Sequence, residues 1–161
     1  MGIPQRIHEY LRSQGIPFEW LHHPQAFTAQ ELAHSMHLSG KRLAKTIVVA
    51  ADGQPVMTVL PASHRLNFND LRGLLEATEV EILPEAELAK ICPDCELGAM
   101  PPLGSLYGID VWVDKTVSES EDIVFSAGTH EDSIRTKYAD FARLVKPHEG
   151  RFSDLWAEKA A

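Results

Sequence analysis

Three groups of residues have types and positions that suit chemistry on a small polar substrate. Lys45 stands at the start of an apolar run, residues 92–108 are rich in glycine and proline, and Gly128-Thr129-His130 follows another apolar run. A lysine can hold a phosphate or polarise a carbonyl as a point charge. A glycine- and proline-rich loop can aim backbone N–H and C=O groups at a substrate. The set favours hydrolysis of a small polar ester with water as the nucleophile.

The first two of these groups also have a structural interpretation. A lysine beside a buried strand can protect a sheet edge from pairing with another chain. The segment 92–108 could be a compact packed connection, although long loops without secondary structure are often functional. Residue type and position alone leave both interpretations open.

The common motifs of nucleophilic, nucleotide-binding and zinc-peptidase sites are absent from the sequence. Cys92 and Cys95 form a C-x-x-C, but no second pair completes a four-ligand zinc site, and the motif follows a helical stretch. We interpret these cysteines as structural or incidental, with a redox or metal role as the alternative. The adjacent His22 and His23 would point to opposite faces of a strand. We therefore expect no metal and no cofactor.

The element that must position Lys45 is a predicted β-hairpin within residues 41–61. Apolar runs at 46–51 and 56–60 flank Asp52-Gly53, a pair that favours the positive φ of a tight strand connection. Both runs show little polar alternation, which predicts a sheet covered on both faces.

The remaining patterns predict one compact domain over residues 1–161, of the α/β (α+β) class, with 147–161 as a C-terminal extension. That extension could add a helical turn or two, packing Phe152 and Trp156 onto the body, or serve in self-association. Apolar periodicity, caps and turn residues place the other elements. We expect helices at 4–14, 29–38 (capped by Thr28), 69–77 (capped by Asn67 or Asn69), 84–91 and 139–145, and strands at 17–21, 80–83, 109–113, 123–126 and 133–137.

The net charge of −8, from 23 acidic and 15 basic residues, argues against a general binder of DNA or other long nucleic acid. It is compatible with a small basic cleft that grips one nucleic-acid end. Lys41, Arg42 and Lys45 are the densest basic cluster, and Arg65 and Arg72 follow. No apolar run approaches the roughly 18–20 residues of a membrane span, and the start lacks the pattern of a signal peptide. We expect a cytoplasmic protein.

Five segments, taken in order, resemble the YbaK / prolyl-tRNA synthetase-associated domain family of free-standing aminoacyl-tRNA deacylases. The resemblance covers most of the chain, and several ordered motifs are far more specific than any one of them. It implies a YbaK-like single domain with a mixed curved β-sheet, a central hairpin and flanking helices. It also implies trans-editing, which is hydrolysis of the ester that joins a wrong amino acid to the 3′ end of a tRNA. The segments are HPQAFTAQELA (23–33), AKTIVV (44–49), VLPASHRL (59–66), DCELGAMPPLG (94–104) and FSAGTHEDSI (125–134).

The resemblance further implies roles for individual residues. Lys45 matches the lysine that contacts the phosphate of the terminal adenosine. Gly98 and Pro102 match a G-x-x-x-P loop whose backbone positions the ester and the attacking water, and His130 matches a position that lines the pocket. These four are the candidate catalytic residues, and a ribose hydroxyl of the substrate is expected to assist. The candidate substrate-binding residues are Thr46, Ala99, Met100, Pro101, Leu103, Gly128 and Thr129.

Two segments, GAMPPLG and ASH, look most like the subgroup that removes alanine from proline tRNA, ProXp-ala. A pocket that excludes by size suits a small residue such as alanine, and Met100 and Leu103 are its hypothesised walls. Relatives act on serine, threonine or cysteine esters, which stay as alternatives. A non-catalytic module that binds tRNA ends or a synthetase is a further alternative, and a thiol protein working through Cys92 and Cys95 is another. The expected partners are a mischarged tRNA and, as a second candidate, an aminoacyl-tRNA synthetase.

Overall fold

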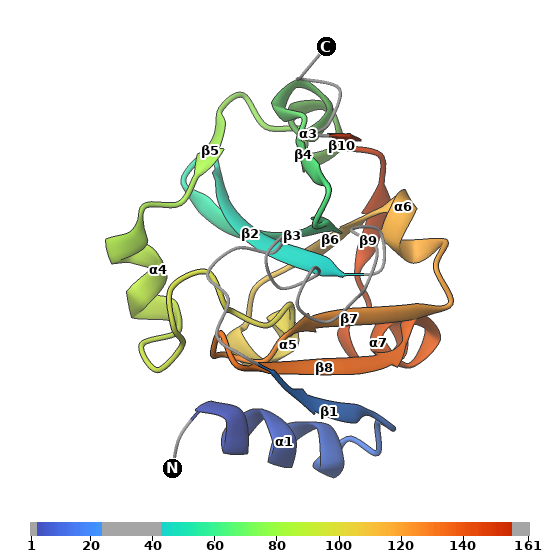
Figure 1. Cartoon of the computed structure of the whole chain (residues 1–161). Coiled ribbons are helices and arrows are strands. Elements are labelled where there is room, and N and C mark those ends of the chain that lie inside the picture. Colours follow the sequence, from blue (N-terminus) through green and yellow to red (C-terminus); the bar gives the residue numbers. More distant parts are fainter. Residues whose placement is uncertain (1–2, 24–42, 156–161) are drawn as a thin grey trace.

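The computed structural model describes residues 3–23 and 43–155 (Figure 1). The predicted helix 29–38 with its Thr28 cap, the cationic residues Lys41 and Arg42, and Trp156 lie outside the described residues. The elements, in chain order, are α1 (Ile3–Ser13), β1 (Glu19–His22), β2 (Ala44–Ala51), β3 (Gln54–Pro61), β4 (His64–Leu66), α3 (Phe68–Leu75), β5 (Val80–Ile82), α4 (Glu85–Ile91), α5 (Gly104–Tyr107), β6 (Val111–Asp114), α6 (Lys115–Ser118), β7 (Asp122–Ser126), β8 (Asp132–Lys137), α7 (Tyr138–Val145), β9 (His148–Gly150) and β10 (Ser153–Leu155).

The strands form a mixed five-stranded sheet in the order β5-β2-β3-β6-β9, a three-stranded sheet β1-β8-β7, and a two-stranded sheet β10-β4. The β3–β6 and β6–β9 pairs are parallel, and the other strand pairs are antiparallel. Figure 1 shows the β2–β3 hairpin crossing the middle of the molecule, with α3 on one side and β7 and β8 on the other. The expected mixed α+β fold with a central hairpin is confirmed.

The hairpin turn follows from two residues with positive φ. Ala51 pairs with Gln54, which leaves Asp52 (φ +48°) and Gly53 (φ +86°) as the connection. The Asp52 carboxylate accepts hydrogen bonds from the backbone N–H of Glu79 at 2.8 Å and of Thr78 at 3.1 Å. These bonds hold the pKa of Asp52 below its usual range and tie the turn to the start of β5.

Successive side chains of β2 and β3 point to opposite faces of the hairpin, and most of them are apolar. Both faces are therefore covered by apolar packing, as the sequence predicts. Val48 and Val59 belong to the main core, which also takes Ile7 of α1 and Phe141 of α7. The opposite face of the hairpin packs into a second core under α3, formed by Val49, Leu60, Leu66, Leu71, Val80 and Phe152. The two strands therefore sit between two layers of packed side chains.

Several predicted elements differ from the structure. Up to residue 155 the predicted extension holds the strands β9 and β10, and Phe152 is fully buried as expected. The rest of the extension lies outside the described residues. A short helix, α5, interrupts the predicted loop 92–108, and the strand β4 was not predicted. Three- and four-residue elements are too short to show a hydrophobic period, so pairing partners decide them. Asn67 caps α3 by accepting from Asp70 N at 3.0 Å.

Candidate functional site

The loop that carries Gly98 is fastened to the turn that carries His130. Backbone N–H of Gly128 donates to Ala99 O, and backbone N–H of Glu96 donates to Gly128 O, both at 2.8 Å. The Glu96 carboxylate also accepts from the backbone N–H of His130 at 2.6 Å. Two segments about thirty residues apart in sequence are thereby held as one rigid unit, which we call the loop–turn assembly (residues 96–103 and 127–131).

Gly98 is one of the exposed residues of this assembly, with Glu96, Leu97 and Glu131. Its φ of +82° lies in the left-handed region that favours glycine, and a β-carbon there would meet the His130 ring at 3.7 Å. The structure thus brings two of the four candidate catalytic residues side by side. The remaining candidates in the loop (Ala99, Met100, Pro101, Pro102 and Leu103) are buried, and Met100 and Leu103 pack in the main core.

Asp132 holds the turn 127–131 in place through side-chain hydrogen bonds. Its carboxylate accepts from Thr129 Oγ1 at 2.6 Å, Trp20 Nε1 at 3.0 Å and His22 at 3.2 Å. Burial alone would raise the pKa of Asp132, but these hydrogen bonds outweigh it and hold the pKa below its usual range. A charged carboxylate that is fully engaged in this way fixes the position of Thr129.

Glu96 and Asp132 are functional candidates that sequence reasoning missed. Both lie inside the family-like segments DCELGAMPPLG and FSAGTHEDSI. The Glu96–His130 bond spans 34 residues, so no local pattern reveals it. The Thr129-x-x-Asp132 spacing is the one signal that could have indicated the side-chain contact across the turn.

Lys45 lies in a different environment. It pairs with Leu60 of the second core, whereas Thr46 pairs with Val59 of the main core, so the two side chains leave β2 on opposite faces. Thr46 therefore shares a face with Met100, and Lys45 lines a cavity of about 480 Å³ on the other side. Burial lowers the pKa of Lys45 from its ordinary value.

A smaller cavity, of about 150 Å³, borders the loop–turn assembly and shares no lining residue with the Lys45 cavity. Gly98, Met100, Glu85 and Glu96 are among its lining residues. The cysteine pair lines it too. Cys92 and Cys95 form a disulfide, and Tyr107 Oη lies 3.2 Å from Cys92 Sγ. In this state the sulfurs are not thiolates, so the close group of Cys92, Asp94 and Cys95 offers a metal no thiolate ligand.

Comparison with known proteins decides the family. Residues 23–144 match the aminoacyl-tRNA editing domain family, and this span includes both the loop–turn assembly and Lys45. The chain belongs to this family. Among the helices of residues 3–23 and 43–155, none has the length and apolar character to cross a membrane.

Curated relatives of this editing domain include proline–tRNA ligases. That of Leuconostoc citreum is 25% identical and covers 86% of this chain and 24% of its own length. That of Bacillus subtilis is 26% identical and covers 92% of this chain and 26% of its own length. This chain therefore spans about a quarter of the length of these relatives.

Solved structures share the fold of this editing domain. Hypothetical protein APE2540 superposes with a TM-score of 0.84 at 18% identity, over 92% of this chain and 99% of the other. A protein provisionally described as a trans-editing enzyme for prolyl tRNA synthetase gives a TM-score of 0.82 at 15% identity, over 96% and 98% of the two chains. At this identity the likeness concerns the fold.

Proposed function

We propose that this protein is a trans-editing aminoacyl-tRNA deacylase, and that its substrate is alanine esterified to proline tRNA. The observation that carries the proposal is the family match over residues 23–144, which contains Lys45, Gly98, Pro102 and His130. The loop–turn assembly adds support, because it holds Gly98 and His130 together on a fixed backbone.

The proposed reaction needs little covalent chemistry from the protein. A water oxygen attacks the ester carbonyl, the bond between that carbon and the ribose oxygen breaks, and the ribose oxygen ends as a hydroxyl. The neighbouring ribose hydroxyl assists the proton transfer. The exposed Gly98 lets the loop backbone approach the ester without a β-carbon in the way.

Lys45 would act on the phosphate of the terminal adenosine. It lies at the start of β2, with Thr46 on the opposite face of the strand. In our proposal the substrate passes this strand end, with its phosphate on the Lys45 side and its ester on the Thr46 side. A single positive charge suits this role, because ammonium groups bind phosphate as point charges.

The small cavity favours a small amino acid. Its volume of about 150 Å³ is below the roughly 300–1,000 Å³ that larger ligands require. The carboxylates of Glu85 and Glu96 complement the positive α-amino group of an aminoacyl ester. An alanyl group matches both the size and the charge of this cavity.

The decisive test is single-turnover hydrolysis of mischarged tRNAs by the wild type and by Lys45→Ala. The panel is proline tRNA carrying alanine, serine, threonine, cysteine or proline, together with correctly charged alanine tRNA. We expect fast, Lys45-dependent loss of alanine from proline tRNA alone. Hydrolysis of another ester would keep the enzyme class and change the substrate. Binding without turnover on every ester would indicate a non-catalytic tRNA-binding module instead.

A further inference from the structure

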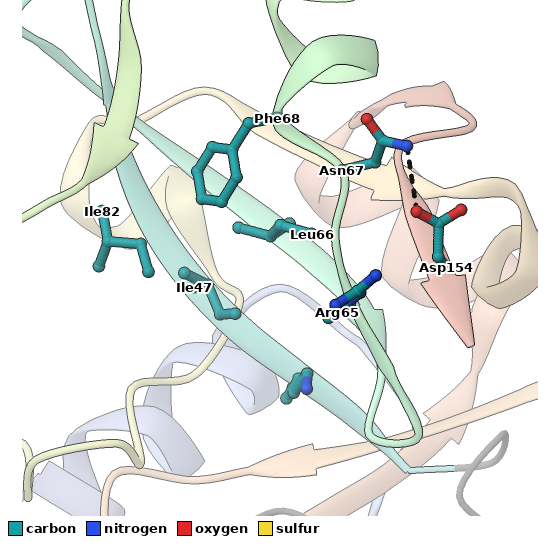
Figure 2. Close-up of a pocket in the computed structure, with 8 residues that line it drawn as sticks. Ile47, Arg65, Leu66, Asn67, Phe68, Ile82 and Asp154 are labelled. Atoms are coloured by element: carbon teal, nitrogen blue, oxygen red, sulfur yellow. Dashed lines mark hydrogen bonds between the residues drawn. The ribbon is translucent and has the colours of Figure 1, made fainter. Parts of the chain in front are cut away.

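The cavity beside Lys45 has a composition that ester hydrolysis alone does not explain. Its volume of about 480 Å³ lies within the roughly 300–1,000 Å³ of small-molecule sites. Figure 2 shows its walls, which come from well-separated parts of the chain. The lining residues are Lys45 and Ile47 of β2, Arg65 and Leu66 of β4, Asn67 and Phe68 at the start of α3, Ile82 of β5, and Asp154 of β10.

The cavity has an apolar side and a polar side. In Figure 2, Phe68 and the aliphatic side chains of Ile47 and Ile82 lie on one side, and Arg65, Asn67 and Asp154 lie on the other. Ile82 is 58% exposed, which extends the apolar side to the protein surface. An apolar side next to a polar side suits a single-stranded nucleobase, since its flat face stacks on aromatic or apolar groups and its edge makes hydrogen bonds.

The polar side is fixed before any ligand binds. Asn67 Oδ1 caps α3, while Asn67 Nδ2 donates to Asp154 Oδ2 at 3.0 Å. Arg65 and Asp154 are direct partners in the register of β4 and β10. The Arg65 guanidinium, the Lys45 ammonium and the Asp154 carboxylate together give the lining one net positive charge, in a chain whose net charge is −8. Charges of this sign attract a phosphodiester backbone.

We propose that this cavity is the binding site for the penultimate nucleotide of the tRNA 3′ end. The base would lie against Phe68, Ile47 and Ile82, and Arg65 would contact its phosphate. The inference rests on the proposed function, in which Lys45 contacts the phosphate of the terminal adenosine. That phosphate joins the terminal nucleotide to its 5′ neighbour, so a neighbour on the Lys45 side enters this cavity.

The base identity agrees with the polar wall. The penultimate nucleotide of tRNA is a cytidine, whose exocyclic amino group is a hydrogen-bond donor. A carboxylate is the acceptor that pairs with this amino group in proteins. Asp154 offers its second oxygen for this bond while Asn67 holds the first.

The test compares two alanyl minihelices of proline tRNA, one natural and one with an abasic penultimate nucleotide. Binding of the uncharged minihelices is measured by fluorescence anisotropy, and single-turnover hydrolysis of the charged ones is measured separately. We expect the abasic change to weaken wild-type binding by about tenfold, as base stacking does. Phe68→Leu should weaken binding of the natural minihelix and make the protein nearly indifferent to the abasic change.

Arg65→Gln should weaken binding and reduce the slope of log K against log[salt] by about one, because one phosphate contact is lost. Arg143→Gln is the matched control, since Arg143 lies on α7 in an ion pair with Asp140 and lines none of this cavity. It should leave affinity and salt slope unchanged. Circular dichroism and melting temperature of each variant separate lost contacts from lost folding.

An unchanged affinity for the abasic minihelix in the wild type would overturn this subsite, whether or not the ester is hydrolysed. Tight displacement of the minihelix by cytidine monophosphate alone would also overturn it, in favour of a free-nucleotide site. Binding that depends on the penultimate base, without hydrolysis of any ester, would keep the subsite and refute the deacylase. The two proposals therefore fail separately.

Discussion

At the scale of single residues, Lys45 combines a charge with partial burial. Its hydrocarbon stem lies at the start of a strand between two cores, and burial lowers its pKa. A residue whose charged form is disfavoured in the folded state makes folding less favourable below its folded pKa. This contribution disappears as pH rises past the unfolded pKa. The charge is therefore expected to serve binding more than stability.

We expect Lys45→Met to abolish deacylation, by a hundredfold or more, and to leave the melting temperature at pH 7 unchanged or raised. Methionine keeps most of the stem packing and removes the ammonium. Single-turnover rates and thermal unfolding of the same preparations check this. A large loss of stability in the methionine variant would return Lys45 to a structural role.

The pH dependence of deacylation should report the same group. After subtraction of the rate without enzyme, wild-type activity should fall as pH rises through the lowered pKa of Lys45, since the neutral amine no longer holds phosphate. Lys45→Arg keeps its charge throughout this range. The activity that Lys45→Arg retains should not fall as pH rises through this range. If it falls with the same midpoint as the wild type, the pH dependence belongs to another group.

Met100 tests the small cavity. Met100→Ala enlarges a wall of that cavity and removes core packing, because Met100 is only 5% exposed. We expect the preference for alanine over larger amino acids to decrease, together with a stability loss of about 2–5 kcal/mol. Hydrolysis of the ester panel and denaturant unfolding measure the two effects. An unchanged amino-acid preference in the folded variant would remove Met100 from the pocket wall.

At the scale of elements, two glycines in and near the loop–turn assembly allow the effect of backbone strain to be distinguished from the loss of a catalytic position. Gly98 and Gly108 both have positive φ (+82° and +71°), and at neither would a β-carbon make a close clash. Alanine at either position should therefore cost a similar backbone strain of about 1–2 kcal/mol. We expect Gly98→Ala to reduce deacylation at least tenfold and Gly108→Ala to leave it near wild type. Equal activity losses would show that only stability is involved.

The disulfide next to this loop gives a second comparison. Replacement of both Cys92 and Cys95 by serine should lower the melting temperature, because their cross-link and the buried Cys92 contacts are lost. We expect deacylation per folded molecule to stay within about twofold of wild type. Activity and thermal unfolding of the double variant measure this, and abolished activity in a folded variant would support the thiol alternative.

At the scale of the whole molecule, what the sequence predicts depends on how far apart the partners lie. The hairpin was predictable because Asp52-Gly53 and its flanking strands are neighbours, and the Asn67 cap needs three residues of context. The strands β9 and β10 were not predictable, because they form by pairing with β6 and β4, which lie far away in the sequence. For the same reason the sequence did not predict the hydrogen bond between Glu96 and His130. It also did not predict that Lys45 and Gly98 line different cavities.

The pairing of β1 with β8 has a consequence for synthesis on the ribosome. Trp20 pairs with Ile134, so more than a hundred further residues must be synthesised before β1 can pair with β8. At the usual rate of synthesis this is a delay of roughly 6–23 s, in which the fully buried Ile7 has no complete core. Stalled nascent chains ending near residue 131 should be cleaved by protease within 3–23. Chains long enough to release β8 from the exit tunnel should resist.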